Sequence, residues 1–229
     1  MNIDKTINYW LDVKQFEEAK AKVITGNFKE STEKDLKILE ILNIQEEDRV
    51  LDFGCGIGRL TEPVSKICKE IIGTDISDEM IGHAAKYCKG KNILFQPLNN
   101  EEGKGLPLDC INKAFSFIVI QHIEKPKAFT ALFSILKSLK IGGQMLIQFP
   151  NLEKNENMYK SMISKNTSGL YYKNPRMEFY TKTELNYIFG LLKMDYKIIE
   201  IETDYYVLAI KKEDVNMKQY FLLPNPRLK

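Results

Sequence analysis

The stretch VLDFGCGIGRLT at residues 50–61 places Gly54, Gly56 and Gly58 at alternate positions behind Asp52 and a short apolar run. Glycine adopts backbone angles that are closed to other residues, and it leaves no Cβ between the main chain and a ligand. The spacing is neither the G-x-G-x-x-G of dinucleotide sites nor the G-x-x-x-x-G-K-[ST] of a phosphate-binding P-loop. The pattern therefore predicts a ligand-binding turn, and it favours a ligand other than a pyrophosphate.

A second acidic residue, Asp75, ends the apolar run EIIGTD. At the end of a strand a carboxylate can accept hydrogen bonds from both hydroxyls of a ribose. Taken alone, a glycine turn and a strand-end Asp are both common, since the Asp can simply cap a helix. Their order and spacing together favour a nucleoside without phosphates.

Alternating strand and helix patterns must position these residues. Strands of 4–8 residues that alternate with helices of 10–15 residues imply right-handed β-α-β crossovers. The last two strands follow a helix whose start is marked by Thr181 and Glu184, which have the spacing of a capping box. The sequence thus predicts an α/β domain with a doubly wound, mostly parallel, seven-stranded sheet. The expected strands are 48–54, 70–77, 92–98, 111–120 and 142–149 with two more in 196–212, and the expected helices are 31–44, 59–69, 78–89, 126–140 and one from 181.

We expect a single domain over residues 1–229 with four parts. Residues 1–30 form an accessory N-terminal segment with a break at 25–27, and residues 31–150 form the ligand-binding core. Residues 151–180 are polar, rich in tyrosine and without clean periodicity, which predicts a lid or insertion. Residues 181–229 supply the last helix, the last strands and a tail.

Composition and charge exclude several classes of function. The formal net charge is +2 with 28% charged residues, which gives no basic stripe for nucleic acid or a membrane surface. No apolar run is long enough to span a membrane, and the N-terminus does not resemble a secretory signal. The four cysteines lack a C-x-x-C spacing, so neither a metal site nor a disulfide framework is indicated. We expect a cytoplasmic protein with reduced thiols, without a metal and without a nucleic-acid or membrane partner.

Over roughly residues 32–150 the sequence resembles the class I S-adenosylmethionine-dependent methyltransferases of the small-molecule type. This resemblance implies a Rossmann-like methyltransferase fold, methyltransferase activity and S-adenosyl-L-methionine as the cofactor. Its motifs are VLDFGCGIGRLT, GTDISDEMIGHA, LNN at 98–100, SFIVIQHIEKP and LKSLKIGGQMLIQF.

The resemblance also implies roles for individual residues. The main chain of the glycine loop would lie against the methionine part of the cofactor, Asp52 would order that loop and meet the ammonium group, and Asp75 would hold the ribose. Ile76 would cover one face of the adenine, and Asn99 with the main chain of Asn100 would meet its edge. The full expected cofactor site is Asp52, Gly54, Cys55, Gly56, Gly58, Asp75, Ile76, Met80, Asn99, Asn100, Ser116 and Phe117.

Two positions depart from the family pattern. Asn99 stands where many members have Asp, and an amide oxygen can still accept from the adenine amino group, so weaker recognition is expected. Asn112 stands where an F-D pair commonly begins the fourth strand, which puts the start of that strand in doubt.

Methyl transfer from a sulfonium is an in-line displacement, so the protein must hold the acceptor atom opposite the sulfur. A hydroxyl acceptor also loses its proton as the new bond forms, and a base must accept that proton. His122, just past the fourth strand, has the right unperturbed pKa for that role, and the alternative is a histidine that packs or caps its loop. His83 belongs to a surface-type helix and is not expected to be catalytic. The acceptor pocket should come from parts outside the common core. Candidates are Tyr9, Trp10, Phe117, Tyr171, Tyr172, Arg176 and Tyr180.

The leading hypothesis is O- or N-methylation of a small molecule. Lysines at 160, 165, 173 and 182 leave methylation of a tRNA or protein open as an alternative. A cofactor-binding protein without catalysis is a further alternative, and the glycine pattern leaves room for a nucleotide-sugar or NAD-dependent enzyme.

Overall fold

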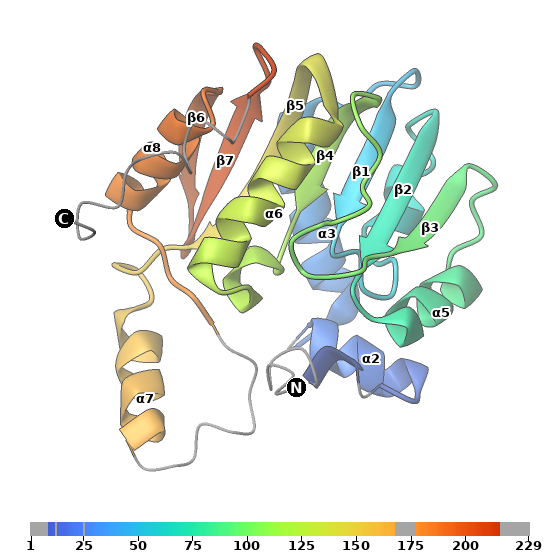
Figure 1. Ribbon diagram of the computed structural model, residues 1–229. Helices are drawn as coiled ribbons and strands as arrows, with labels where there is room; N and C mark the ends of the chain where they lie inside the picture. Colours follow the sequence, from blue (N-terminus) through green and yellow to red (C-terminus); the bar gives the residue numbers. More distant parts are fainter. Residues whose placement is uncertain (1–8, 12, 25, 168–176, 216–229) are drawn as a thin grey trace.

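The computed structural model describes residues 9–11, 13–24, 26–167 and 177–215. These residues contain a seven-stranded sheet in the order β3-β2-β1-β4-β5-β7-β6 (Figure 1). The first five strands of this order, from β3 at the edge to β5, are parallel to one another. Strand β7 runs antiparallel to both β5 and β6. The predicted doubly wound, mostly parallel sheet is therefore confirmed. Its strands are β1 Arg49–Phe53, β2 Glu70–Asp75, β3 Ile93–Pro97, β4 Ile111–Ser116, β5 Leu139–Pro150, β6 Asp195–Ile201 and β7 Asp204–Ile210.

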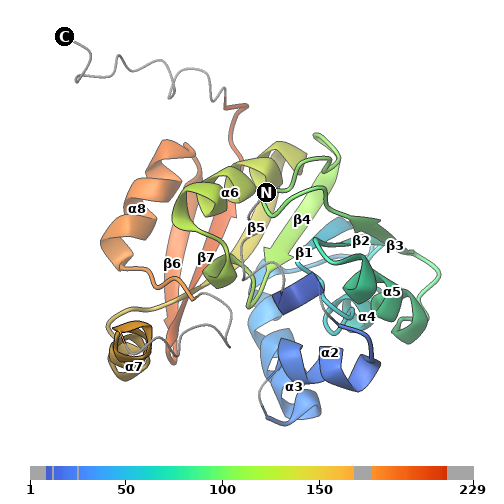
Figure 2. The same ribbon diagram turned by 60° about the horizontal axis from the view of Figure 1, so that its bottom comes forward.

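Helices cover both faces of the sheet (Figures 1 and 2). One face packs against α6 and α8, and the other packs against α3 and α4. In β1 the side chains alternate between these two cores, with Leu51 and Phe53 on one side and Val50 on the other. The helices are α2 Phe16–Val23, α3 Phe28–Leu39, α4 Thr61–Val64, α5 Asp78–Tyr87, α6 Lys125–Ser138, α7 Glu156–Thr167 and α8 Lys182–Leu191, with short 3₁₀ turns η1 Glu40–Leu42 and η2 Ile120–His122.

Two predicted helix boundaries were wrong, and so was the end of the strand predicted over 111–120, which stops at Ser116 because the chain turns at Ile118, whose φ is 61°. Helix α3 begins before Ser31, because the side chain of Asn27 accepts hydrogen bonds from the amides of Lys29 and Glu30 and caps the helix there. The helix predicted over 59–69 is only the single turn α4. Its continuation is lost because the chain already turns back toward β2, where the amide of Lys69 donates to the carbonyl of Asp48 at 3.0 Å.

Other local features follow the sequence more closely. Thr181 and Glu184 form the predicted capping box at the start of α8. Asn112 lies within β4, where its side-chain oxygen accepts a hydrogen bond from the amide of Arg49 at 3.0 Å. An amide oxygen thus serves at the position where the family commonly has Asp, and β4 still begins at Ile111. The predicted insertion contains α7, a helix that its weak periodicity did not indicate.

None of the helices within the described residues is both long and apolar enough to cross a membrane.

Candidate cofactor and acceptor pocket

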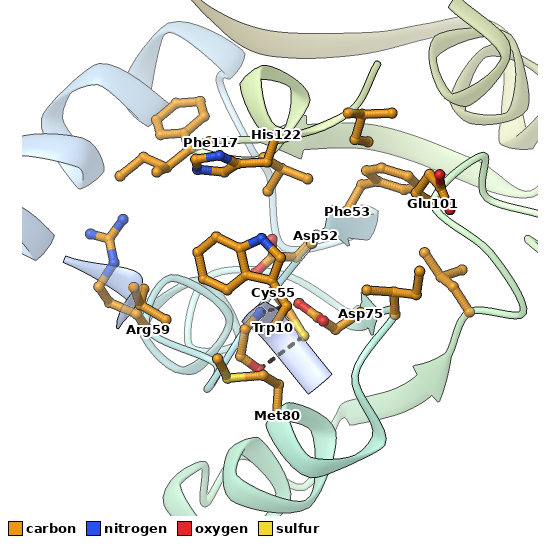
Figure 3. A pocket seen from close by; sticks show the side chains of 18 of the residues that line it. Trp10, Asp52, Phe53, Cys55, Arg59, Asp75, Met80, Glu101, Phe117 and His122 are labelled. Atoms are coloured by element: carbon orange, nitrogen blue, oxygen red, sulfur yellow. Dashed lines mark hydrogen bonds between the residues drawn. The ribbon is translucent and has the colours of Figure 1, made fainter. Parts of the chain in front are cut away.

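A pocket lies at the carboxyl ends of β1, β2 and β4, which are neighbours in the sheet (Figure 3). The loop after β1 forms one wall, and Asp75 at the end of β2 forms another. The N-terminal segment contributes Trp10 and Val23 from outside the sheet. The lining residues are Trp10, Val23, Asp52, Phe53, Gly54, Cys55, Gly56, Arg59, Leu60, Asp75, Ile76, Met80, Leu98, Glu101, Phe117, Ile118, Val119, His122, Ile123 and Glu124.

The glycine loop turns sharply and packs tightly against other parts of the chain. All three glycines have positive φ, at 81° for Gly54, 53° for Gly56 and 81° for Gly58. A Cβ on Gly54 would lie 2.3 Å from the side chain of Val119, and one on Gly58 would lie 2.4 Å from Sγ of Cys88. At Gly54 and Gly58 the space beside the main chain is therefore filled by side chains of the protein, although the glycine pattern predicted that a ligand would approach there. Gly54, Cys55 and Gly56 border the pocket, whereas Gly58 is not among the residues that line it.

Asp75 links the glycine loop to the end of β2. Its Oδ2 accepts from the amide of Gly56 at 2.9 Å, and its Oδ1 accepts from the amide of Ser77 at 2.9 Å. Burial raises the pKa of Asp75, while these amides and that of Ile76 act in the opposite direction. A carboxylate oxygen has two lone pairs, so each oxygen can still accept one hydroxyl hydrogen. Asp75 is thus already oriented by the backbone and retains capacity for a diol.

Asp52 is buried beneath the glycine loop. Its Oδ2 accepts a hydrogen bond from the Thr61 hydroxyl at 2.6 Å. Burial raises the pKa of Asp52 to about 7, with the Thr61 hydrogen bond and the charge of Arg59 lowering it and the charge of Asp75 raising it. Asp52 therefore titrates near neutrality, and a cation in the pocket would favour its ionised form.

An apolar wall and an acid lie beyond Asp75. Ile76 and Leu98 line the pocket there, and Glu101 reaches it from the following turn, held by Lys127 at 2.7 Å. Neither Leu98 nor Glu101 was among the predicted site residues. The pattern LNN drew attention to the amides, although the acid two residues after Asn99 was equally visible in the sequence.

Several of the residues predicted for the cofactor site do not line the pocket. Asn99 is exposed, and the side chain of Asn100 accepts from the amide of Lys104. The hydroxyl of the buried Ser116 donates to the carbonyl of Phe53 at 2.8 Å, which ties β4 to β1. Gly58 packs on α5. The other predicted cofactor residues border the pocket: Asp52, Gly54, Cys55, Gly56, Asp75, Ile76, Met80 and Phe117.

His122 also lines the pocket, at the end of η2. The centre of its ring lies 5.1 Å from that of Trp10, and the two rings are tilted by 54°. Figure 3 shows both side chains reaching into the same space, with Phe117 beside His122. Burial raises the pKa of Cys55 well above its ordinary value, which favours the neutral thiol over the nucleophilic thiolate.

Two further acceptor candidates, Tyr9 and Tyr180, are not among the residues that line this pocket. Tyr9 packs edge-on against Trp10, with ring centres 4.9 Å apart, and Tyr180 is buried against Phe149. Other predicted contributors lie outside the described residues. These are Tyr171, Tyr172 and Arg176, together with Lys173 of the predicted lysine patch.

The pocket fits S-adenosylmethionine as a ligand. Figure 3 shows Glu101, Asp75 and Asp52 following one another along the pocket, and they offer an edge acceptor, a diol acceptor and an anion in that order. Ile76 and Leu98 add apolar surface to the lining. An adenine, a ribose and an ammonium group follow one another in the same order in this cofactor. No described residue near Asp75 provides the cationic cradle that a pyrophosphate requires.

Known proteins are similar to part of this chain in sequence and to most of it in fold. Residues 50–143 match the family described as a methyltransferase domain. A ubiquinone biosynthesis O-methyltransferase of Rhizobium etli is 28% identical over 103 residues, which are 43% of this chain and 40% of that protein. A 23S rRNA (uracil(1939)-C(5))-methyltransferase of Vibrio cholerae is 34% identical over 70 residues, which are 29% of this chain and 16% of that protein. The chain thus matches less than half the length of these relatives.

Solved structures share the whole fold. A protein from Pyrococcus horikoshii superposes with a TM-score of 0.69 at 16% identity and covers 90% of this chain and 99% of its own. Magnesium protoporphyrin IX methyltransferase from Synechocystis, solved with bound SAH, superposes with a TM-score of 0.65 at 14% identity over 91% of this chain and 100% of its own. Residues 50–143 therefore resemble a methyltransferase domain, and the chain shares its fold with solved S-adenosylmethionine-dependent methyltransferases.

Proposed function

We propose that this chain binds S-adenosyl-L-methionine in the pocket and transfers its methyl group to an oxygen or nitrogen atom of a small molecule. The observation that carries the proposal is the position of Asp75. It lies at the end of β2, is held by the loop after β1, and faces a pocket in a chain whose residues 50–143 match a methyltransferase domain.

The proposed binding mode follows the order of groups in the pocket. Asp75 accepts hydrogen bonds from the ribose hydroxyls, and Ile76 and Leu98 contact the adenine faces. Glu101 accepts a hydrogen bond from the edge of the adenine. The resemblance had assigned this role to Asn99 and Asn100, but Glu101 lines the pocket and the two asparagines do not. Asp52 in its ionised form pairs with the ammonium group of the methionine part. Met80 and the main chain of residues 54–56 complete the walls.

The cofactor supplies an electrophilic methyl group on a sulfonium. The chain's own residues hold the acceptor atom in line and exclude water, which is most of the catalysis in such a displacement. Trp10 and Phe117 provide flat apolar surfaces for this purpose. His122 lies beside Trp10 and accepts the proton of a hydroxyl acceptor as the new bond forms.

A small acceptor is supported by the aromatic lining at Trp10, Phe117 and His122 and by the net charge of +2. Two proteins similar to this chain are named for small molecules, ubiquinone and magnesium protoporphyrin IX. Another is named for 23S rRNA, which keeps an RNA acceptor as the second candidate. The four cysteines are free thiols, which fits a reducing compartment such as the cytoplasm.

Calorimetry tests the cofactor first. We expect S-adenosylmethionine and its demethylated product to bind with micromolar affinity and NAD not to bind. Binding of NAD alone would overturn the proposal. A transfer assay with a labelled methyl group then compares a pool of small metabolites with total RNA. Label in the small-molecule fraction supports the proposal, and label only in RNA assigns the second candidate.

A further inference from the structure

Acidic side chains outnumber basic ones in the lining of the pocket. The four acids are Asp52, Asp75, Glu101 and Glu124. Among the described residues that line it, Arg59 is the only arginine or lysine, and its Nη2 donates to Oδ2 of the buried Asp35 at 2.6 Å. Because this ion pair already balances the charge of Arg59, the described lining attracts cations and repels anions.

Glu124 is the acid that the proposed binding of the donor leaves unused. It lies at the N-cap position of α6, where its side chain makes no capping hydrogen bond. The first two lysines of this helix are paired with other acids. Lys125 pairs with Glu184 at 2.6 Å. Lys127 pairs with Glu101 at 2.7 Å. Glu124 is exposed and lines the pocket, so its charge is available to a second ligand.

The loop after β4 carries aromatic rings as well as Glu124. It supplies Phe117 and His122 to the pocket, and Figure 3 shows Trp10 beside His122. The ring centres of Trp10 and His122 lie 5.1 Å apart. A cation is attracted to the face of an aromatic ring, and to tryptophan most strongly. A carboxylate together with an indole favours a positively charged ligand over a neutral or a negative one.

The movement of charge during methyl transfer also depends on the acceptor. With a nitrogen acceptor the positive charge passes from the sulfur to the nitrogen, whereas with an ionised oxygen acceptor the two opposite charges cancel. A fixed anion beside the acceptor stabilises the charge that develops on nitrogen in the transition state. The same anion repels an ionised oxygen acceptor.

We propose that the acceptor is a small amine, which enters the pocket as an ammonium ion and is bound by the carboxylate of Glu124 and the ring of Trp10. This inference rests on the proposed function and names its substrate class, so that the methyl group goes to nitrogen. Glu124 is a binding residue for the acceptor, and it plays no part in binding the donor.

An ammonium ion must lose a proton before its nitrogen can react. His122, two residues before Glu124, accepts this proton on a ring nitrogen. The lone pair of the amine nitrogen then forms a bond to the methyl carbon, while the carbon–sulfur bond breaks and leaves its electron pair on the sulfur. The product is a methylated ammonium ion, and the proton on His122 passes to water.

The test identifies the charge and the atom of the methylated product. The protein is incubated with methyl-labelled S-adenosylmethionine and a pool of small metabolites, and the products are separated from the donor and passed over a cation exchanger at neutral pH. We expect the label in a retained product, and mass spectrometry should place it on nitrogen. Label on an oxygen atom, or in a product that the exchanger does not retain, would overturn the inference and leave the proposed function intact.

Glu124→Gln tests the residue with the same pool. The kcat/KM for the retained product should fall about tenfold, because the charge-assisted contact with the ammonium ion is lost, and donor affinity should not change. Glu124→Asp keeps the charge and should stay within about threefold of the wild type. Equal kcat/KM in Glu124→Gln and the wild type would overturn the role of Glu124.

Glu47→Gln is the matched control. It removes the same charge from an exposed turn before β1, at the opposite end of this strand from the pocket, and should behave as the wild type. Two other outcomes concern the proposed function itself. Failure to bind S-adenosylmethionine, or label found only in RNA, would overturn that function and this inference with it.

Discussion

The rings of Trp10 and His122 lie 5.1 Å apart, although 111 residues separate them in the chain. One belongs to the N-terminal segment and the other to the 3₁₀ turn after β4, and both line the pocket. The segment that the sequence presented as an accessory therefore forms part of the candidate site.

Trp10 is the only tryptophan of the chain, so it reports on this pocket directly. We expect its emission to shift to shorter wavelength when S-adenosylmethionine is added, because the ligand excludes water from the pocket that Trp10 lines. Fluorescence titration with excitation at the tryptophan band measures the effect, and Trp10→Phe serves as the blank. Unchanged emission at concentrations where calorimetry detects binding would show that the ligand does not approach Trp10.

Asp75→Asn should weaken cofactor binding by tenfold or more. A charge-assisted hydrogen bond contributes about 1.5 to 3 kcal/mol, and Asp75 also orders the loop through the amide of Gly56. Calorimetry with the demethylated product measures the loss. Asp78→Asn, an exposed acid at the start of α5, is the matched control and should bind normally. Equal affinities for wild type and Asp75→Asn would exclude the ribose role.

Asp52 should make the free energy of unfolding depend on pH. Burial raises its pKa to about 7 in the folded chain, whereas an exposed Asp titrates near its ordinary value of 3.8. Between these values the folded state holds the extra proton, so Asp52 stabilises the fold at low pH, and this contribution is lost as the pH rises toward 7. Each unit of pKa shift corresponds to about 1.4 kcal/mol.

Urea unfolding of Asp52→Asn and wild type at several pH values from 5 to 8 measures this contribution. Asparagine keeps an oxygen that can accept the Thr61 hydrogen bond and does not ionise. The stability of the variant relative to wild type should therefore rise between pH 5 and 7 and then level off. Parallel pH profiles for the two proteins would show that Asp52 has an ordinary pKa.

Gly58 should be required for stability rather than for binding. Its φ of 81° disfavours any side chain, and a Cβ would lie 2.4 Å from Sγ of Cys88. We expect Gly58→Ala to reduce the free energy of unfolding by about 2 kcal/mol. Gly82→Ala, within α5 and with nothing within 4 Å of its Cβ, should instead stabilise by about 0.5 to 1 kcal/mol. Thermal unfolding of both variants measures their Tm values. A change of Tm in the same direction for Gly58→Ala and Gly82→Ala would contradict the prediction.

His122→Ala should lower kcat about 100-fold when the acceptor is a hydroxyl and leave cofactor affinity nearly unchanged. The pH profile of kcat should lose its acidic limb, because that limb reports the protonation of the base. His83→Ala on α5 is the control and should retain full turnover. Unaltered turnover of His122→Ala on its acceptor would assign His122 to packing against Trp10.

Much of the fold was accessible from the sequence because its signals are local. Buried parallel strands appear as short apolar runs, and Thr181 with Glu184 marks a helix start within four residues. The two helix boundaries that failed depend on competition between signals. Asn27 is a cap four residues ahead of the Ser31 that also looked like one, and α4 stops because the chain must reach β2.

The sequence by itself determined the order of strands and helices, the glycine turn after β1 and the acid at the end of β2, because each depends on residues close together in the chain. Only the tertiary structure decided what shares the pocket. Arg59, Glu101 and His122 share it because parallel strands bring distant loops to one edge of the sheet, and Trp10 reaches the same pocket from the N-terminal segment. It also showed that neighbouring side chains crowd Gly54 and Gly58, since packing between distant segments leaves no trace in local spacing.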